Sequence, residues 1–187
     1  MKNLTLLAIL FSIYITNAQE FQLTDTYDIL NQRSSGQEEE DIWLVDVIVK
    51  DNPENPIASL AISNFGLLDE IRISVLENPG LENVTEILKI TIEYNVCCAS
   101  TEEFYYLVRN DNDFIALPSI KNEYAYEPIS DIHYIFPIQS YGKEETILKA
   151  ALQYTETYTI KDINVLRSIA WNDNDFNTED AFTAINY

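Results

Sequence analysis

Apolar and polar residues alternate with a period of two along most of the chain after position 41. The clearest case is segment 86–94, where Leu88, Ile90, Ile92 and Tyr94 alternate with Lys89, Thr91 and Glu93. Successive side chains of a strand point to opposite faces, so this pattern predicts a strand with one apolar and one charged face. Similar patterns, rich in Ile, Val, Thr, Tyr and Phe, predict strands at 43–49, 57–62, 71–75, 104–108, 114–117, 132–138, 147–159 and 165–171.

The connections between these segments are short, which indicates that neighbouring strands run antiparallel. Turn residues occupy 51–56, 78–80, 110–113, 141–144 and 161–164. Segment 147–152 also has helical spacing, with Glu145 and Lys149 forming an i,i+4 pair, so one short helix there is an alternative. The predicted fold is all-β, an antiparallel β-sandwich or meander of about eight to ten strands, with a partly closed barrel as the alternative.

The first eighteen residues have the layout of a secretory signal peptide. Lys2 precedes an apolar run over 4–15, and Thr16 and Ala18 place small residues before a cleavage point. The run is shorter than the ~20 residues that a membrane-spanning helix needs. We therefore expect cleavage after Ala18, a secreted or periplasmic location, and no stable membrane insertion afterwards.

The expected organisation is a signal peptide at 1–18, a polar and acidic leader or linker at 19–41, and a single β-rich domain at 42–187. A short helix at 25–32, capped by Asp25, is an alternative within the leader.

Composition narrows the range of partners. The formal net charge is −20, and loss of Lys2 with the leader makes it −21, which repels the phosphate backbone of nucleic acids. Apolar residues make up 47% of the chain, which favours an ordered domain over a disordered one. Four glycines in all leave no room for a glycine-rich nucleotide loop.

One five-residue sequence, Asn-Asp-Asn-Asp-Phe, occurs at 110–114 and again at 172–176. Its carboxylates are hard oxygen ligands of the kind that Ca²⁺ requires. If calcium binds, the candidate ligands are Asp111, Asp113, Asp173 and Asp175, in a structural site, and no other cofactor is expected. Asn and Asp are also common in hairpin turns, so the alternative is that both copies of the sequence are turns that bind no metal.

Cys97 and Cys98 are the only cysteines, and they are adjacent. A disulfide between neighbours is strained, because their Cα atoms lie ~3.8 Å apart and a disulfide usually spans more. The pair therefore forms either a strained disulfide or free thiols.

His133, the only histidine, follows Asp131 and Ser130, an order that allows a catalytic assembly. A structural role for His133, in which its ring only forms hydrogen bonds, explains the same sequence.

Tyrosine is abundant, with twelve residues in the chain. Those on or beside predicted strands could form an aromatic surface for a sugar or a protein, and the candidate ligand-binding residues are Tyr105, Tyr106, Tyr124 and Tyr126. Core and cross-strand packing explains the same residues without a ligand.

Segment 96–100, with its Cys97–Cys98 pair, and the aromatic strand 102–108 after it together resemble small exported proteins of Gram-negative bacteria of unassigned role. The leader ending in Asn17, Ala18 and Gln19 is also similar to theirs. The resemblance implies export and a β-rich body, and it transfers no catalytic residue.

The sequence thus predicts a non-enzymatic exported β-domain that binds a protein, a glycan or a cell-surface component. Two alternatives stay open. One is a secreted hydrolase that acts on glycans through paired carboxylates, whose separation only a structure can give. The other is a structural module stabilised by calcium.

Overall fold

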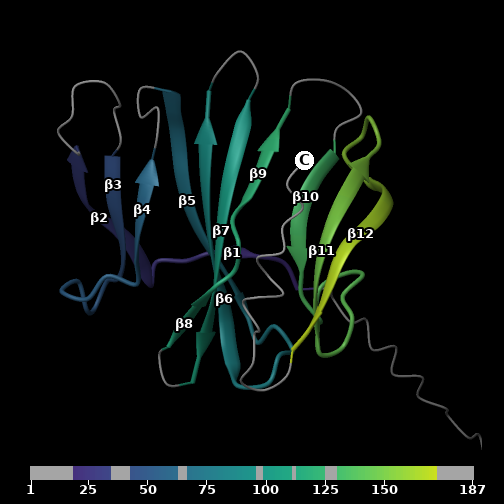
Figure 1. Ribbon diagram of the computed structural model, residues 1–187, viewed down its shortest axis with the longest axis horizontal. Coiled ribbons are helices and arrows are strands. Elements are labelled where there is room, and N and C mark those ends of the chain that lie inside the picture. The colour runs from purple at the N-terminus through teal and green to yellow at the C-terminus, as the bar shows by residue number, and fades with distance from the viewer. Residues whose placement is uncertain are drawn as a thin grey trace, which may run out of the picture.

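The computed structural model describes residues 19–34, 43–62, 67–95, 99–110, 113–124 and 130–171. In these ranges the chain forms twelve β-strands and no α-helix, and every strand pair is antiparallel (Figure 1). The all-β prediction is therefore confirmed. None of the described residues belongs to a helix long and apolar enough to cross a membrane.

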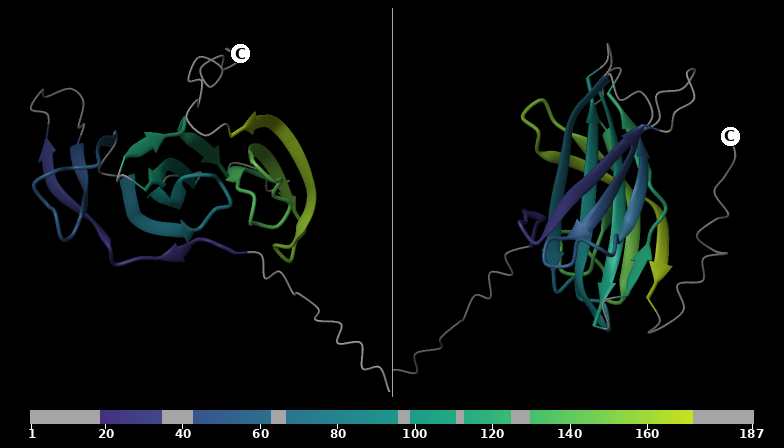
Figure 2. Two further views of the ribbon diagram at one scale, coloured as in Figure 1. Left: turned by 90° about the horizontal axis from the view of Figure 1, so that it is seen from below. Right: turned by 90° about the vertical axis from the view of Figure 1, so that its left-hand side faces the viewer.

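The strands form three sheets, each built largely from consecutive strands. The central sheet contains β5 (Leu68–Glu77), β6 (Val84–Tyr94) and β7 (Ser100–Arg109); β1 (Gln22–Leu23) pairs with β5, while β8 (Phe114–Ala116) and β9 (Ile120–Glu123) pair with β7. The N-terminal sheet contains β2 (Tyr27–Ser34), β3 (Trp43–Val49) and β4 (Ala58–Ile62). The C-terminal sheet contains β10 (Ser130–Ile135), β11 (Thr146–Tyr154) and β12 (Ile160–Ala170). Figures 1 and 2 show the central sheet between the other two.

Each side of the central sheet has its own apolar core. Leu88, Ile90 and Ile92 of β6 are fully buried in a cluster that includes Val45 and Leu60 of the N-terminal sheet. Ile87, the neighbour of Leu88, is fully buried in a second cluster. That cluster joins the central sheet to the C-terminal sheet through Tyr105, Leu107, Tyr134, Phe136 and Ile147. The alternation along β6 therefore serves two cores, because successive side chains enter opposite layers.

Loop contacts connect the central sheet to the C-terminal sheet. The indole nitrogen of Trp171 donates a hydrogen bond to the carbonyl oxygen of Glu82 at 2.9 Å. Gly80 has φ of +81°, and a Cβ there would lie 2.9 Å from the Cβ of Pro137, so this turn needs glycine for both its conformation and its close approach. These contacts fix the position of β10, which carries part of the site described below.

The described part of the expected leader, residues 19–34, contains β1 and β2, and the helix considered as an alternative at 25–32 is absent from it. Tyr27 pairs with Val49 of β3 and is buried, so pairing with a neighbouring strand overrides the weak local helix signal. Residues 1–18 and 35–41 lie outside the described residues.

The short helix considered at 147–152 is a strand, β11. Ile147 belongs to the second core, while Leu148, Ala150 and Leu152 are buried in a further cluster. Because both faces of this strand are buried, apolar residues follow one another and imitate helical spacing. The turn expected at 161–164 is also displaced: those residues lie in β12, and the chain turns at 155–159, where the amide of Thr155 donates to the carbonyl of Thr159 at 2.9 Å.

Candidate functional site

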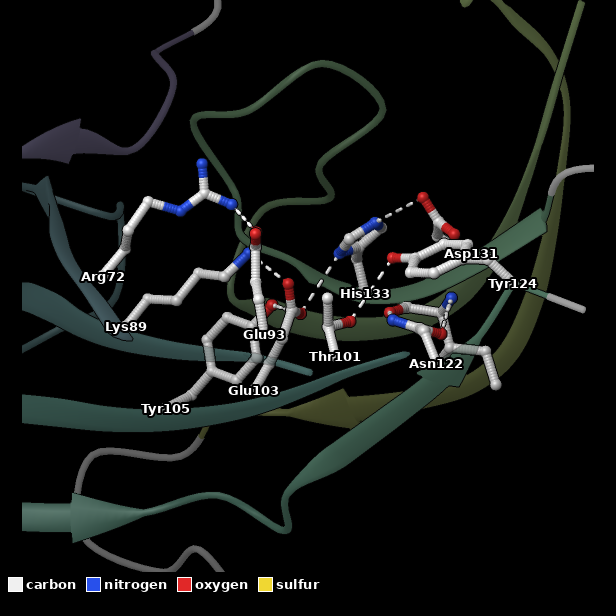
Figure 3. Close-up of polar contacts among 11 residues, drawn as sticks. Arg72, Lys89, Glu93, Thr101, Glu103, Tyr105, Asn122, Tyr124, Asp131 and His133 are labelled. Carbon is white, nitrogen blue, oxygen red and sulfur yellow. Dashed lines mark hydrogen bonds and ion pairs between the residues drawn. The ribbon is translucent and has the colours of Figure 1, made fainter. Parts of the chain in front are cut away.

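A group of charged side chains lies beside the second core, between the central sheet and β10 (Figure 3). Lys89 comes from β6, Glu103 from β7, and Asp131 and His133 come from β10. Lys89 lies on the polar face that alternation assigns to β6. That face is covered here rather than solvated, since Lys89 is largely buried and Glu103 is buried.

Glu103 is the centre of this network, which we call the Glu103 network. The Nζ atom of Lys89 lies 2.6 Å from Oε1 of Glu103, and Nδ1 of His133 lies 3.3 Å from its Oε2. The hydroxyl of Tyr105 donates to the same Oε2 at 2.5 Å. On the other side of the imidazole ring, Nε2 lies 3.7 Å from Oδ2 of Asp131. A buried carboxylate is stable only when it is paired and hydrogen-bonded, and Glu103 meets both conditions.

The network sets the charge of its members. Burial alone would raise the pKa of Glu103, but the hydrogen bond from His133 and the charges of Lys89 and His133 together lower it to about 2. Burial likewise opposes protonation of His133, yet its contacts with Asp131 and Glu103 outweigh burial and the charge of Lys89, so its pKa is raised. Burial and the Glu103 charge raise the pKa of Tyr105, which keeps its hydroxyl a donor.

Strand β10 is held beside β9 by one side chain. Asn122 donates from Nδ2 to the carbonyl oxygen of Ile132 at 3.1 Å, and its Oδ1 accepts from the amide of Ile132 at 2.8 Å. The amide group thus imitates a backbone pairing between the central and C-terminal sheets. This contact places His133 within reach of Glu103, because Ile132 precedes His133 in β10.

An open cavity of about 170 Å³ adjoins the Glu103 network. Its apolar lining includes Phe21, Tyr105, Tyr134, Ile135, Tyr141 and Leu152. Its polar lining comprises Gln19, Glu20, Lys89, His133, Gln139 and Ser140. Lys89 is held at this cavity between two rings, since Nζ lies 5.5 Å from the ring centroids of both Phe21 and Tyr105.

The loop after β10 supplies one rim of the cavity. The side chain of Gln139 accepts a hydrogen bond from the amide of Phe136 at 3.0 Å, and the amide of Gly142 donates to the carbonyl of Gln139 at 2.9 Å. Gly142 lies so close to the backbone that a Cβ would come within 2.2 Å of the carbonyl oxygen of Phe136. A tight glycine turn therefore presents Ser140 and Tyr141 to the cavity.

The predicted tyrosine surface does not form among the described residues. Tyr105 is 1% exposed in the second core, whereas its neighbour Tyr106 is 9% exposed in the first core on the opposite face. Tyr124 is partly exposed, and its hydroxyl lies 3.3 Å from Oγ1 of Thr101. Tyr126 lies outside the described residues. Packing explains Tyr105 and Tyr106, although one part of Tyr105 also lines the cavity.

Of the four calcium candidates, only Asp113 lies in the described part of the chain. It is exposed, and its Oδ2 lies 3.8 Å from Nη1 of Arg109. Asp111, Asp173 and Asp175 fall outside the described residues, as do Cys97 and Cys98. Within the described ranges no group of three or more His, Cys, Asp or Glu side chains could hold a metal ion.

The order Ser130, Asp131, His133 does not give a catalytic triad. Oδ2 of Asp131 lies 3.7 Å from Nε2 of His133 and so faces the ring. Ser130 is three positions from His133, so in an extended strand the two side chains point to opposite faces. The contact of His133 with Glu103 identifies it as part of a buried ionic network.

Sequence reasoning missed Phe21, Lys89 and Glu103 as site residues. Phe21 was assigned to the leader or linker, Lys89 to the charged face of its predicted strand, and Glu103 lies one position before the strand predicted at 104–108. The available signal was a lysine on one predicted strand and a glutamate at the edge of the next, which the register of the sheet brings together.

A second and wider cleft, of about 770 Å³, lies where Tyr27 and Asn52 of the N-terminal side face Glu86 and Asp113. The first cavity is the better candidate site, because two cationic side chains that the Glu103 network holds in place, Lys89 and His133, are among its lining residues beside aromatic rings. Comparisons of this chain with family models, with curated proteins and with solved structures give no match.

Proposed function

We propose that this protein is a non-enzymatic, exported binding domain that holds a sugar, as a monosaccharide or the end of a glycan, in the cavity beside the Glu103 network. One observation carries the proposal: an open cavity of about 170 Å³ is lined both by aromatic rings and by preorganised polar groups. Drug-sized ligands occupy pockets of about 300–1,000 Å³, so this cavity fits a smaller ligand.

The two kinds of lining suit the two kinds of surface on a sugar ring. The C–H faces of a pyranose pack against aromatic rings, and Phe21 and Tyr141 offer such rings at the cavity. The hydroxyl groups need donors and acceptors, which the ammonium of Lys89 and the hydroxyl of Ser140 supply. Because the Glu103 network already fixes Lys89 and His133, binding costs little side-chain ordering there.

The same network argues for binding over catalysis. A general acid or base works best with a pKa near the operating pH. The pKa of Glu103 is lowered to about 2 and its carboxylate is engaged by three side chains, while the pKa of His133 is raised. A carboxylate with so low a pKa is not suited to exchange protons with a substrate at neutral pH, and this disfavours a carboxylate-dependent hydrolase at this cavity.

Export belongs to the same proposal. Cleavage after Ala18 would make Gln19 the first residue of the mature chain, and Gln19, Glu20 and Phe21 all line the cavity. The segment that follows the expected signal peptide is thus part of the proposed site. A glycan of the cell surface or of the surroundings is the ligand class that such a protein would meet in the periplasm or outside the cell.

A glycan array, followed by NMR titration of any sugar it identifies, tests the proposal. Tyr141 is 61% exposed and lines the cavity, so Tyr141→Ala should weaken binding about tenfold, or about 1.4 kcal/mol, without unfolding the protein. Tyr158→Ala is the matched control, since Tyr158 is 74% exposed in the turn after β11 and is not among the lining residues. Absence of sugar binding, or equal effects of the two variants, would contradict the proposal.

A further inference from the structure

We propose that the sugar bound in this cavity is acidic, with a carboxylate that pairs with Lys89, as in a uronic acid. This inference rests on the proposed function and adds the charge of the ligand. It follows from the positions of the charged groups around the cavity rather than from their net charge.

The positive members of the Glu103 network face the cavity, and the negative members lie behind them. Lys89 and His133 are among the lining residues, whereas Glu103 and Asp131, which hold them in place, are not. Figure 3 shows Glu103 between the two cationic side chains. Among the described lining residues, Glu20 supplies the one carboxylate, and its side chain is exposed to solvent.

Lys89 is prepared for an anionic partner. An ammonium group has three N–H donors, and Glu103 is the one ion-pair partner within 4.0 Å that the described residues give it. The rings of Phe21 and Tyr105, at 5.5 Å, hold the group in position without accepting a conventional hydrogen bond. A carboxylate in the cavity could accept a remaining N–H in a charge-assisted hydrogen bond, which is stronger than one to a neutral hydroxyl.

The strongly negative charge of the whole chain, formally −20, does not oppose this inference. At physiological ionic strength the screening length is about 8 Å, so exposed carboxylates farther away are largely screened. Contacts inside a partly enclosed cavity are screened much less. The pairing with Lys89 therefore decides the preference, while the net charge mainly slows the approach of an acidic ligand.

The test compares acidic sugars with their neutral counterparts. Glucuronate and glucose, galacturonate and galactose, and mannuronate and mannose are titrated against the mature protein by ¹H–¹⁵N NMR. At least one acid should bind about tenfold more tightly than its neutral partner, and added salt should reduce the difference. If an acid and its neutral partner bind equally, or the neutral sugar binds better, this inference is overturned and sugar binding stands. If none of the six binds, and the glycan array is also negative, both proposals fail.

A charge variant separates the cavity from the overall charge. Glu20→Gln removes the exposed carboxylate at the cavity and should tighten acid binding two- to fivefold, with no effect on neutral sugars. Glu54→Gln is the control, because Glu54 is exposed beside the N-terminal sheet and the variant changes the net charge equally. Equal gains in the two variants would show that only net charge acts, and would overturn the inference. Lys89→Met should abolish the acid preference, and the Glu20 variant keeps the test decisive if that protein does not fold.

Discussion

Lys89 and Glu103 meet diagonally across the β6–β7 pair. In the register of the sheet Lys89 lies opposite Tyr105 and Glu103 lies opposite Thr91, yet the ammonium nitrogen reaches to 2.6 Å from the carboxylate. Diagonal neighbours on one face of an antiparallel pair are within reach of long side chains. This geometry leaves the second oxygen of Glu103 for Tyr105 and His133, so one carboxylate joins the central sheet to β10.

The first prediction concerns the stability that depends on Glu103. Glu103→Gln keeps the shape of the side chain and removes its charge, which leaves Lys89 without its ion-pair partner and His133 with Asp131 alone. We expect the free energy of unfolding to fall by about 3 kcal/mol, as when one partner of a buried ion pair is removed. Urea denaturation followed by fluorescence measures the change.

Glu70→Gln serves as the control for that measurement. Glu70 pairs with Arg72 at 3.7 Å in the same central sheet, but both side chains are about half exposed. Exposed pairs contribute about 0–1 kcal/mol, so this variant should be close to wild type. A loss of similar, small size in the two variants would show that the Glu103 network does not stabilise the fold.

The second prediction concerns pH. The pKa of Glu103 falls from 4.5 to about 2 on folding, so its contribution is complete above about pH 4.5 and is lost as the pH falls toward 2. The pKa of His133 rises above 6.5, so its contribution is complete below about pH 6.5 and is lost as the pH rises through the higher, folded value. These two groups together favour greatest stability between about pH 4.5 and 6.5.

His133 can be observed directly, because it is the only histidine in the chain. Its imidazole resonances should titrate with a midpoint above 6.5, since Glu103 and Asp131 face the ring and outweigh burial and the nearby charge of Lys89. In Glu103→Gln the midpoint should fall. A midpoint below 6.5 in the wild type would mean that burial dominates and that His133 is neutral at pH 7.

Much of this fold could be predicted from alternation, and its limits can be located in particular strands. The pattern along β6 correctly separates Leu88, Ile90 and Ile92 from Lys89. It cannot say what covers each face, because that depends on strands far away in sequence. The charged face of β6 meets β10, and only this contact turns Lys89 from a surface residue into a site residue.

The polar N-terminal segment shows a different limit. Residues 19–34 contain few apolar side chains, and no periodicity distinguishes them from a linker. Phe21 nevertheless packs its ring against Tyr105 at 6.1 Å and Phe136 at 6.2 Å between ring centroids. One or two anchoring aromatics fix such a segment, and neither composition nor period detects so small a number. Strand β9, with the sequence Ile-Lys-Asn-Glu, was not predicted either, because its one apolar residue, Ile120, makes no pattern.

The third prediction tests the bridge between β9 and β10. Asn122→Ala removes both hydrogen bonds to Ile132 and leaves a partly buried amide and a partly buried carbonyl without those partners. We expect a loss of about 2–4 kcal/mol, since each unsatisfied buried group costs about 1–3 kcal/mol. Hydrogen exchange at the amide of Ile132 should also become faster. Asn164→Ala, at an exposed position of β12, is the control, and equal losses in the two variants would refute the bridging role.

The fourth prediction concerns calcium. Asp113 is exposed and pairs with Arg109, which favours a turn over a metal site for the first Asn-Asp repeat. We therefore expect the melting temperature to be the same with EDTA and with added Ca²⁺. A melting temperature that EDTA lowers and Ca²⁺ restores would support the calcium interpretation, and Asp111→Asn and Asp173→Asn would then show which repeat binds.

The last prediction decides whether the segment after the expected cleavage point is a passive leader or a wall of the site. Phe21→Ala removes a ring that contacts Tyr105 and Phe136 and lies 5.5 Å from the ammonium of Lys89. We expect a loss of about 1–3 kcal/mol of stability, typical of a partly buried aromatic, and weaker binding of any sugar that the protein binds.

Leu23→Ala is the matched control for Phe21→Ala, because Leu23 is apolar and only two residues away but is 77% exposed. Its removal should change stability by no more than about 0.5 kcal/mol. Thermal unfolding and sugar titration of both variants separate the alternatives. If Phe21→Ala has as little effect as Leu23→Ala, then the segment lies beside the cavity without contributing to binding. If Phe21 alone is required, the mature N-terminal segment is part of the binding site, because its ring both closes the second core and holds the ammonium of Lys89 at the cavity.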